Sequence, residues 1–261
     1  MRLRPVVQML VACVLVVGGC AGSGPRAADV VATAPTPGRW TVTALGDSVT
    51  AGSGCDCAPF VDHYAELTHR ATGFRVTADN LGVPGQTSEQ LLATLTGDTD
   101  TTRRVADSDI VIVTIGANDF VPALDDWASG GCDLACFRTV ADSVRTEVGA
   151  IAQRIRAVRG GFPTAILVTD YWNVFRDGDV AQELGAGYDQ ISEQVTRLAD
   201  TAICDGLVDT GAVCVDLYAP FKGDGTGDPT GLLAADGDHP NAVGHLLIAE
   251  TLAAEGWKLR A

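Results

Sequence analysis

The sequence predicts an α/β protein in which helices cover both faces of a central parallel sheet, a three-layer α/β/α sandwich. Short apolar runs alternate with longer amphipathic ones from residue 40 onward. The clearest run, residues 110–115, is β-branched throughout and apolar on both faces, as a central parallel strand should be. Residues 140–158 instead carry apolar side chains three or four positions apart, the spacing of one helix face. Because strands alternate with helices, we expect a parallel sheet.

Each expected element has a local signal. Thr87 or Ser88 caps the second helix, Gly160-Gly161 closes the third, and Asn241 caps the last. The expected strands are residues 41–45, 74–78, 110–115, 165–168 and 212–217. The expected helices are residues 60–70, 88–95, 140–158, 184–198 and 242–252, and residues 80–85 are expected to form a turn.

The predicted sheet gives several polar residues a common location. In open parallel sheets, ligands bind in a crevice at the carboxyl ends of the strands. Ser48 follows the first strand, Gly85 the second and Asn118 the third, while Asp236 and His239 follow the last. We therefore expect these five residues to meet at one edge of the sheet.

The chain is expected to have three parts. Residues 1–19 resemble a signal peptide, with two arginines followed by an apolar run that is short for a membrane span. The run ends at Cys20 in a sequence resembling the lipobox of bacterial lipoproteins, which predicts a lipid anchor; ordinary secretion with nearby cleavage is the alternative. Residues 20–39 are expected to be a flexible tether carrying the lipidated cysteine, and residues 40–261 a single domain.

The charge of the chain limits its partners. The formal net charge is −15, and it becomes −17 without Arg2 and Arg4 of the signal. An acidic surface argues against a nucleic acid partner, because phosphate binding draws on clustered lysine and arginine. It also argues against electrostatic adhesion to anionic lipid, which leaves Cys20 as the expected membrane attachment. The sequence does not indicate an oligomeric state.

Six cysteines remain beyond the signal and the lipobox, and an even number in an exported chain indicates disulfides. Closeness in sequence favours Cys132–Cys136 and Cys204–Cys214, with Cys55–Cys57 as the remaining pair. Zinc is the alternative, but zinc sites usually have two-residue gaps and nearby histidine or cysteine ligands. We therefore expect no metal and no cofactor.

A serine, a histidine and a carboxylate are the parts of a nucleophilic active site. A serine hydroxyl needs a base to take its proton, and the base needs a carboxylate to orient it. Ser48 is the candidate nucleophile and His239 the candidate base. Asp236 can reach back to the ring across a turn, whereas the adjacent Asp238 would tend to point away. The amides of Ser48 and Gly85 and the side chain of Asn118 could stabilise an oxyanion.

Four short motifs occur in the order found in one known family. They are Gly46-Asp-Ser-Val-Thr50, Asn80-x-Gly-x-x-Gly85, Gly116-Ala-Asn-Asp119 and Asp236-x-x-His239. Together they resemble the four blocks of the SGNH, or GDSL-type, esterase and lipase family, and the resemblance covers the domain from about residue 42 to 255. The resemblance implies a flavodoxin-like fold and metal-free hydrolysis of carboxylic esters through an acyl-enzyme. By position it makes Ser48 the nucleophile, His239 the base and Asp236 its orienter. It places Gly85 and Asn118 with Ser48 in the oxyanion hole.

The sequence leaves several alternatives open. The acyl-enzyme could pass its acyl group to a sugar, or the enzyme could remove acetyl groups from carbohydrates. A noncatalytic glycan-binding lipoprotein is a third hypothesis. Tyr171 and Trp172, which follow the fourth strand, are expected to line the substrate pocket, with core packing as the alternative. The expected partners are a small-molecule, lipid or glycan acyl ester and a membrane held through the lipid anchor. The expected location is the outer face of the cell membrane or the surroundings.

Overall fold

The computed structural model describes residue 27 and residues 30–256. Its five strands form one sheet in the order β2-β1-β3-β4-β5, and every neighbouring pair is parallel. This order is the flavodoxin-like one, so the predicted fold is confirmed. The strands are β1 (Arg39–Gly46), β2 (Arg75–Gly82), β3 (Ile110–Thr114), β4 (Ala165–Thr169) and β5 (Val213–Val215).

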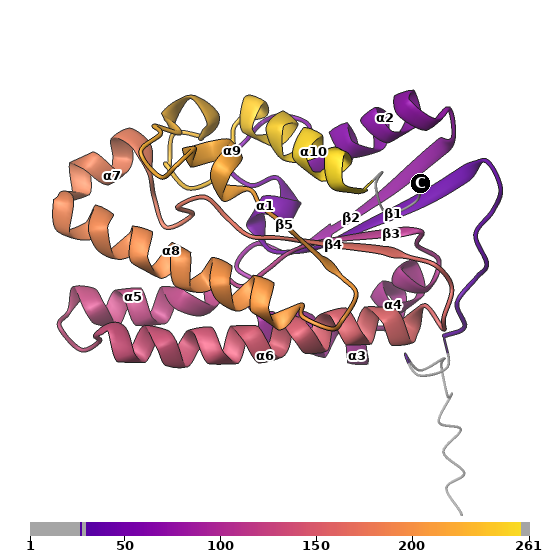
Figure 1. The fold of residues 1–261 in the computed structure, drawn as a ribbon, viewed down its shortest axis with the longest axis horizontal. Coiled ribbons are helices and arrows are strands. Elements are labelled where there is room, and N and C mark those ends of the chain that lie inside the picture. The colour runs from indigo at the N-terminus through magenta and orange to yellow at the C-terminus, as the bar shows by residue number, and fades with distance from the viewer. Residues whose placement is uncertain (1–26, 28–29, 257–261) are drawn as a thin grey trace, which may run out of the picture.

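Helices cover the two faces of the sheet, as Figure 1 shows. On one face α2 (Phe60–Thr72) packs against α10 (Ala242–Gly256). On the other face α6 (Leu134–Val158) packs against α3 (Ser88–Gly97) and α8 (Ala186–Gly206). All five residues of β3 and of β4 are buried, because these strands lie between the two helical layers. The shorter helices are α1 (Ser48–Ala51), α4 (Thr99–Ala106), α5 (Val121–Ala128), α7 (Gly178–Leu184) and α9 (Tyr218–Lys222).

Several element boundaries differ from the sequence-based expectation, and two of the differences have a clear cause in the backbone. Residues 80–82 are the end of β2 and not part of a turn, since the pairing with β1 continues to Gly46 opposite Gly82. The predicted helix at residues 184–198 is two helices, because Gly185 adopts a φ of 92° and separates α7 from α8. The predicted helix caps are present. The Thr87 side chain accepts a hydrogen bond from Gln90 N, and the Asn241 side chain accepts hydrogen bonds from Val243 N and Gly244 N.

The first part of the chain is only partly described. The predicted signal peptide and Cys20 lie outside the described residues. Within the predicted tether, Thr33 N donates to Ala106 O at 3.3 Å, and the Thr33 hydroxyl donates to Asp107 at 2.9 Å. This stretch therefore lies against the end of α4. None of the helices in the described part of the chain is long and apolar enough to cross a membrane.

In the described part of the chain, three disulfides join the six cysteines in the pairs that closeness in sequence favours. The Cα atoms are 5.2 Å apart in Cys55–Cys57, 5.9 Å in Cys132–Cys136 and 5.3 Å in Cys204–Cys214. The last pair ties the end of α8 to β5, whereas the first two close short loops.

Candidate active site

Ser48 lies at the junction of β1 and α1, where the chain turns sharply. Gly46 adopts a φ of 126°, and a Cβ atom there would come within 1.8 Å of Thr114 O on β3. Only glycine allows this close approach of two backbones. Asp47 caps α1, and half-buried Ser48 is its first residue. The serine thus lies at the point where neighbouring connections run to opposite sides of β1, the usual ligand position in this topology.

A buried hydrogen-bond network holds this junction. Asp47 accepts from Val49 N at 3.0 Å, from the Thr114 hydroxyl at 2.7 Å and from the Tyr171 hydroxyl. The Thr114 hydroxyl also lies 2.8 Å from that of Thr50. Burial raises the pKa of Asp47, while the hydrogen bonds from Tyr171 and Thr114 oppose the rise. The network joins β1, α1, β3 and the segment after β4, so it fixes the backbone on which Ser48 stands.

His239 and Asp236 form a hydrogen-bonded pair in the turn before α10. His239 Nδ1 lies 2.8 Å from Asp236 Oδ2, and Asp236 Oδ1 accepts from the backbone amides of Asp238 and His239 at 3.1 Å each. Partial burial works to raise the pKa of Asp236, but the hydrogen bonds from His239 and the backbone outweigh it and the pKa is lowered. Because the carboxylate accepts from Nδ1, the lone pair of the neutral ring is on Nε2.

Asp238 has a different environment from Asp236. Its Oδ2 atom lies 3.9 Å from His239 Nδ1, beyond hydrogen-bond distance. Burial raises the pKa of Asp238 to about 6, although the nearby His239 opposes the rise. The geometry therefore pairs the histidine with Asp236, as the sequence predicted.

A cavity of 260 Å³ brings the two ends of the domain together. Ser48, Asn118 and Asp238 all line it, and His239 is the residue after Asp238. Gly54, on the loop after α1, also touches the pair: a Cβ there would lie 2.7 Å from His239 Cβ and 3.0 Å from Asp236 Oδ2. The segments that carry the candidate nucleophile and the candidate base are thus in contact.

The candidate oxyanion residues come from two loops that are tied together. Asn118 Nδ2 donates to Gln86 O at 3.1 Å. The Ser88 amide and hydroxyl donate to Asp119, at 3.1 and 2.6 Å. Gly85, next to Gln86, adopts a φ of 79°, which glycine tolerates best. Asn118 lines the cavity, while Gly85 is not among its lining residues.

The two aromatic residues expected to line the pocket are instead buried beside it. Tyr171 and Trp172 are at most 1% exposed. Trp172 stacks on Phe221 at 4.2 Å and donates from Nε1 to Asp238 O at 3.2 Å. Neither is among the residues that line the cavity. The two side chains hold Asp47 and Asp238 in place, because the Tyr171 hydroxyl donates a hydrogen bond to Asp47 and Trp172 Nε1 donates one to Asp238 O.

The wall of the cavity comes from residues that sequence reasoning missed. Val174, Phe175 and Arg176 line it from the segment after β4, and Asp125 and Tyr188 line it from α5 and α8. Arg176 adopts a φ of 94°, which is rare outside glycine and often marks a functional position. A non-glycine residue with this backbone has no sequence signature, so only the structure could find it.

Two other features are distinct from this site. A larger hollow of 650 Å³, lined by Trp40, Arg156 and Ala165 among others, lies where β1 and β4 begin, at the opposite edge of the sheet. Within the described residues, Cys55, Cys57 and His245 form a group with metal-ligand spacing, but its two sulfurs are bonded to each other. Neither feature includes a candidate catalytic residue.

Comparison with known proteins identifies the family. Residues 44–247 match the GDSL-like Lipase/Acylhydrolase family, and the chain belongs to that family. It is therefore an enzyme, a carboxylic ester hydrolase, which decides against the noncatalytic glycan-binding hypothesis. No curated protein matched the chain.

Solved structures with the same fold include esterases and lipases. The lipase Lip_vut3 from a goat rumen metagenome aligns with a TM-score of 0.70 at 20% identity, over 84% of this chain and 98% of that chain. LAE5, an alpha/beta hydrolase enzyme from the metagenome of Lake Arreo, Spain, gives 0.60 at 19% identity, over 85% and 97%. A variant of Axe2, an acetyl-xylooligosaccharide esterase from Geobacillus stearothermophilus, gives 0.59 at 17% identity, over 83% and 93%.

Proposed function

We propose that the protein is a serine esterase that cleaves carboxylic acyl esters through an acyl-enzyme on Ser48. The observation that carries this proposal is the 2.8 Å hydrogen bond from His239 Nδ1 to Asp236, in a turn that borders the serine-lined cavity. This bond leaves the Nε2 lone pair available as a base. Family membership supports the same chemistry.

The reaction follows from these roles. His239 Nε2 takes the hydroxyl proton of Ser48 while the oxygen attacks the ester carbonyl. Asp236 holds the ring and stabilises the imidazolium that forms. The developing oxyanion is stabilised by the amides of Ser48 and Gly85 and by the Asn118 side chain. The imidazolium then protonates the departing alcohol, and a water activated by the same base releases the acid.

The test is the loss of hydrolysis in Ser48→Ala. We expect p-nitrophenyl acetate turnover to fall by about a thousandfold or more, because the covalent route is removed, with an unchanged circular dichroism spectrum. Ser53→Ala is the matched control, since Ser53 lies on the next loop and does not line the cavity. A fluorophosphonate probe should label wild type and Ser53→Ala but not Ser48→Ala. Near wild-type turnover in Ser48→Ala would remove this serine from the mechanism.

The polar wall of the cavity favours a more specific substrate class, an acyl ester of a carbohydrate. Asp125, Arg176 and Tyr188 offer acceptors and donors suited to sugar hydroxyls, and the volume of 260 Å³ favours a short acyl group. We expect acetylated xylo-oligosaccharides to be cleaved with a higher kcat/KM than p-nitrophenyl esters of long acyl chains. Arg176→Ala should raise KM for the sugar ester more than for p-nitrophenyl acetate. Rates that rise with acyl length would favour a lipase instead.

The same acyl-enzyme could transfer its acyl group to a sugar hydroxyl. This acyltransferase activity is separated from hydrolysis by product analysis with an added sugar acceptor. Transfer that exceeds hydrolysis at millimolar acceptor would change the assignment.

We further propose that the enzyme is exported and held at the outer face of the cell membrane by lipid on Cys20. The lipobox-like sequence supports this, as do the three disulfides, which persist in oxidising compartments. Membrane fractionation of wild type and Cys20→Ser tests it. The wild type should sediment with membranes and the variant should not. Equal distribution of the two would favour ordinary secretion.

A further inference from the structure

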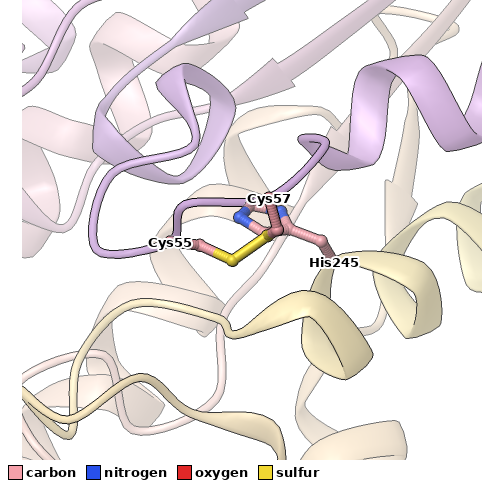
Figure 2. A group of neighbouring side chains, drawn as sticks. All are labelled: Cys55, Cys57 and His245. Carbon is pink, nitrogen blue, oxygen red and sulfur yellow. A yellow bond between two sulfur atoms is a disulfide. The ribbon is translucent and has the colours of Figure 1, made fainter.

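Outside the proposed catalytic residues, one group of reactive side chains is brought together by tertiary structure. The Cys55–Cys57 disulfide lies on the loop between α1 and α2, and His245 lies on α10, nearly two hundred residues later. A ring nitrogen of His245 and both sulfurs lie within 4.8 Å of one another. Figure 2 shows the imidazole directly beside the disulfide.

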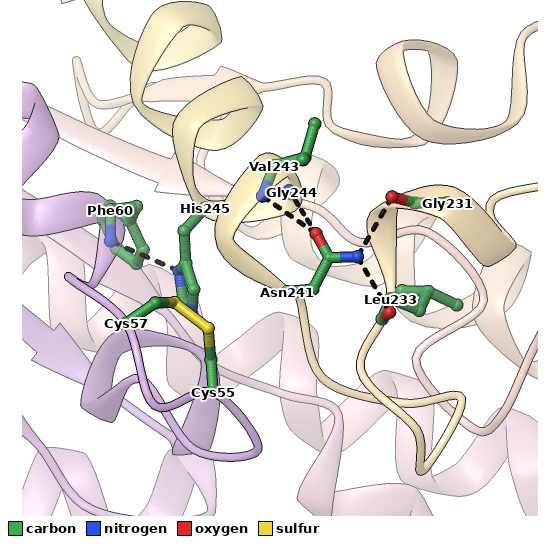
Figure 3. Close-up of a disulfide and its surroundings, with 9 residues drawn as sticks. All are labelled: Cys55, Cys57, Phe60, Gly231, Leu233, Asn241, Val243, Gly244 and His245. Carbon is green, nitrogen blue, oxygen red and sulfur yellow. Dashed lines mark hydrogen bonds between the residues drawn. A yellow bond between two sulfur atoms is a disulfide. The ribbon is translucent and has the colours of Figure 1, made fainter.

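The tautomer of His245 follows from one hydrogen bond. Phe60 N, the first amide of α2, lies 3.2 Å from His245 Nδ1. Figure 3 marks this hydrogen bond with a dashed line. A backbone N–H can only donate, so Nδ1 is the acceptor and the ring proton is on Nε2. His245 is fully buried, and burial lowers its pKa to about 4, so the ring is neutral. Among the described residues, Nε2 has no hydrogen-bond partner.

This tautomer suits a thiolate and not a metal ion. A neutral ring with Nδ1 occupied and Nε2 protonated has no lone pair to offer a cation. The sulfurs, being bonded to each other, are not available as thiolates either. The buried Nε2–H has no partner among the described residues while the disulfide is closed, and the ring belongs to the same 4.8 Å group as both sulfurs. A donor without a partner can stabilise a thiolate that forms beside it, so the group is arranged for the opening of the disulfide.

Two further features favour a reactive disulfide. Cys57 comes three residues before Phe60, at the amino end of the thirteen-residue helix α2. Positive charge at a helix amino terminus lowers the pKa of a nearby thiol. Both cysteines are partly exposed, so an external thiol can reach them. With a separation of two residues, the pair also closes the shortest loop of the three disulfides, so by chain entropy it stabilises the fold least.

We propose that Cys55–Cys57 is a thiol–disulfide exchange site, that its substrate is an external dithiol, and that His245 stabilises its leaving thiolate. A thiolate of the dithiol attacks one sulfur and forms a mixed disulfide, and the other cysteine leaves as a thiolate that accepts from His245 Nε2–H. The second thiol of the dithiol, deprotonated by solvent, then releases the first cysteine. The dithiol is oxidised to its disulfide, and the two cysteines take up two protons from solvent.

Gly54 connects the Cys55–Cys57 pair to the proposed catalytic site. Gly54 precedes Cys55 and packs against His239 and Asp236. Opening the disulfide frees the loop beside Gly54, which removes support from His239. This consequence rests on the proposed esterase function, whereas the exchange site does not. We expect ester hydrolysis to fall about tenfold when this pair is reduced, because small displacements of catalytic groups are costly.

The test follows the three disulfides separately. The folded protein is treated with dithiothreitol under native conditions, alkylated at intervals, and each cysteine is quantified by mass spectrometry. Cys55–Cys57 should open about tenfold faster than Cys132–Cys136, which is similarly exposed but has no histidine within 4.8 Å among the described residues. Equal rates for the two pairs would overturn the proposal.

Two variants isolate the role of His245. In His245→Asn the side-chain oxygen can still accept from Phe60 N, but the donor at Nε2 is lost. Opening should slow by about tenfold, and the pH midpoint of alkylation of the reduced pair should rise. In His245→Gln the amide nitrogen can take the place of Nε2, so opening should recover. Opening rates equal to wild type in His245→Asn, with a folded spectrum, would contradict the proposal.

Esterase activity is measured in the same samples. A loss of activity that follows reduction of Cys55–Cys57, and that returns on reoxidation, supports the link to His239. Activity that stays constant while the pair opens would overturn the link. An oxidised protein that hydrolyses no ester would overturn the proposed function instead, while the opening rates would still test the exchange site.

Discussion

His239 and His245 lie six residues apart, yet their environments give them opposite chemistry. In both rings Nδ1 makes the defining hydrogen bond. In His239 it donates to the Asp236 carboxylate, which leaves a lone pair on Nε2. In His245 it accepts from Phe60 N, which leaves a proton on Nε2. The comparison shows that the partner of one nitrogen decides whether the other is a base or a donor.

Burial sharpens the difference between the two rings. The His239 side chain is 17% exposed and borders a cavity, so its free nitrogen can meet a substrate. His245 is fully buried, and its free nitrogen can reach only its immediate neighbours. Position in the fold thus separates a candidate catalytic histidine from a supporting one.

The largest effect is expected from Asp236→Asn, which removes the partner that sets the His239 tautomer. The amide can donate to Nδ1, and the ring would then carry its proton on Nε2 and lose its function as base. We expect kcat for p-nitrophenyl acetate to fall about a thousandfold or more, with little change in Tm. A loss of less than tenfold would mean that another group orients the ring.

Gly54→Ala tests the contact between the loop and the His239–Asp236 pair. The new Cβ would lie 2.7 Å from His239 Cβ, at a φ of +76° that disfavours alanine. We expect kcat to fall about ten- to a hundredfold as His239 is displaced. Gly73→Ala is the control, since it has a similar φ of +71° but nothing within 4 Å of the new atom. Equal activity of the two variants would show that the contact is not required.

The acid stability of the protein tests the neutral state of His245. Its pKa is lowered by burial and by His63 and His239 to about 4, below the ordinary value of 6.5. Between these values the unfolded chain binds more protons, so stability is full above pH 6.5 and falls as pH falls toward 4. Between pH 7 and pH 4, the free energy of unfolding should fall by about 2 kcal/mol more in wild type than in His245→Asn. The measurement is urea unfolding from pH 4 to 7, and equal slopes for both proteins would contradict the prediction.

The smallest effect is expected from Asp238→Asn. The carboxylate lies 3.9 Å from His239 Nδ1 and does not set its tautomer. Since burial raises its pKa to about 6, the amide resembles the protonated form present below that pH. We expect kcat to change less than tenfold, with any loss confined to higher pH. A pH–rate profile checks this, and a loss as large as in Asp236→Asn would reverse the roles of the two carboxylates.

Local signals in the sequence were sufficient to predict the helices and strands and to recognise the motifs in their order. The periodicity of residues 140–158 and the β-branched run at 110–115 reflect interactions within one element and its immediate layer, so they predict a helix and a buried strand. The choice of Asp236 over Asp238 could also be made from sequence, because a side chain three residues away can fold back across a turn.

Other features depend on contacts between distant segments, which only the tertiary structure decides. Tyr171 and Trp172 follow β4 as expected, but packing against Asp47 and Phe221 turns them away from the cavity. Arg176 lines the cavity and has a positive φ, a backbone conformation that no sequence pattern predicts for an arginine. The tautomer of His245 is set by an amide 185 positions away. Sequence therefore determined what each segment can form, while the fold determined which polar atoms meet.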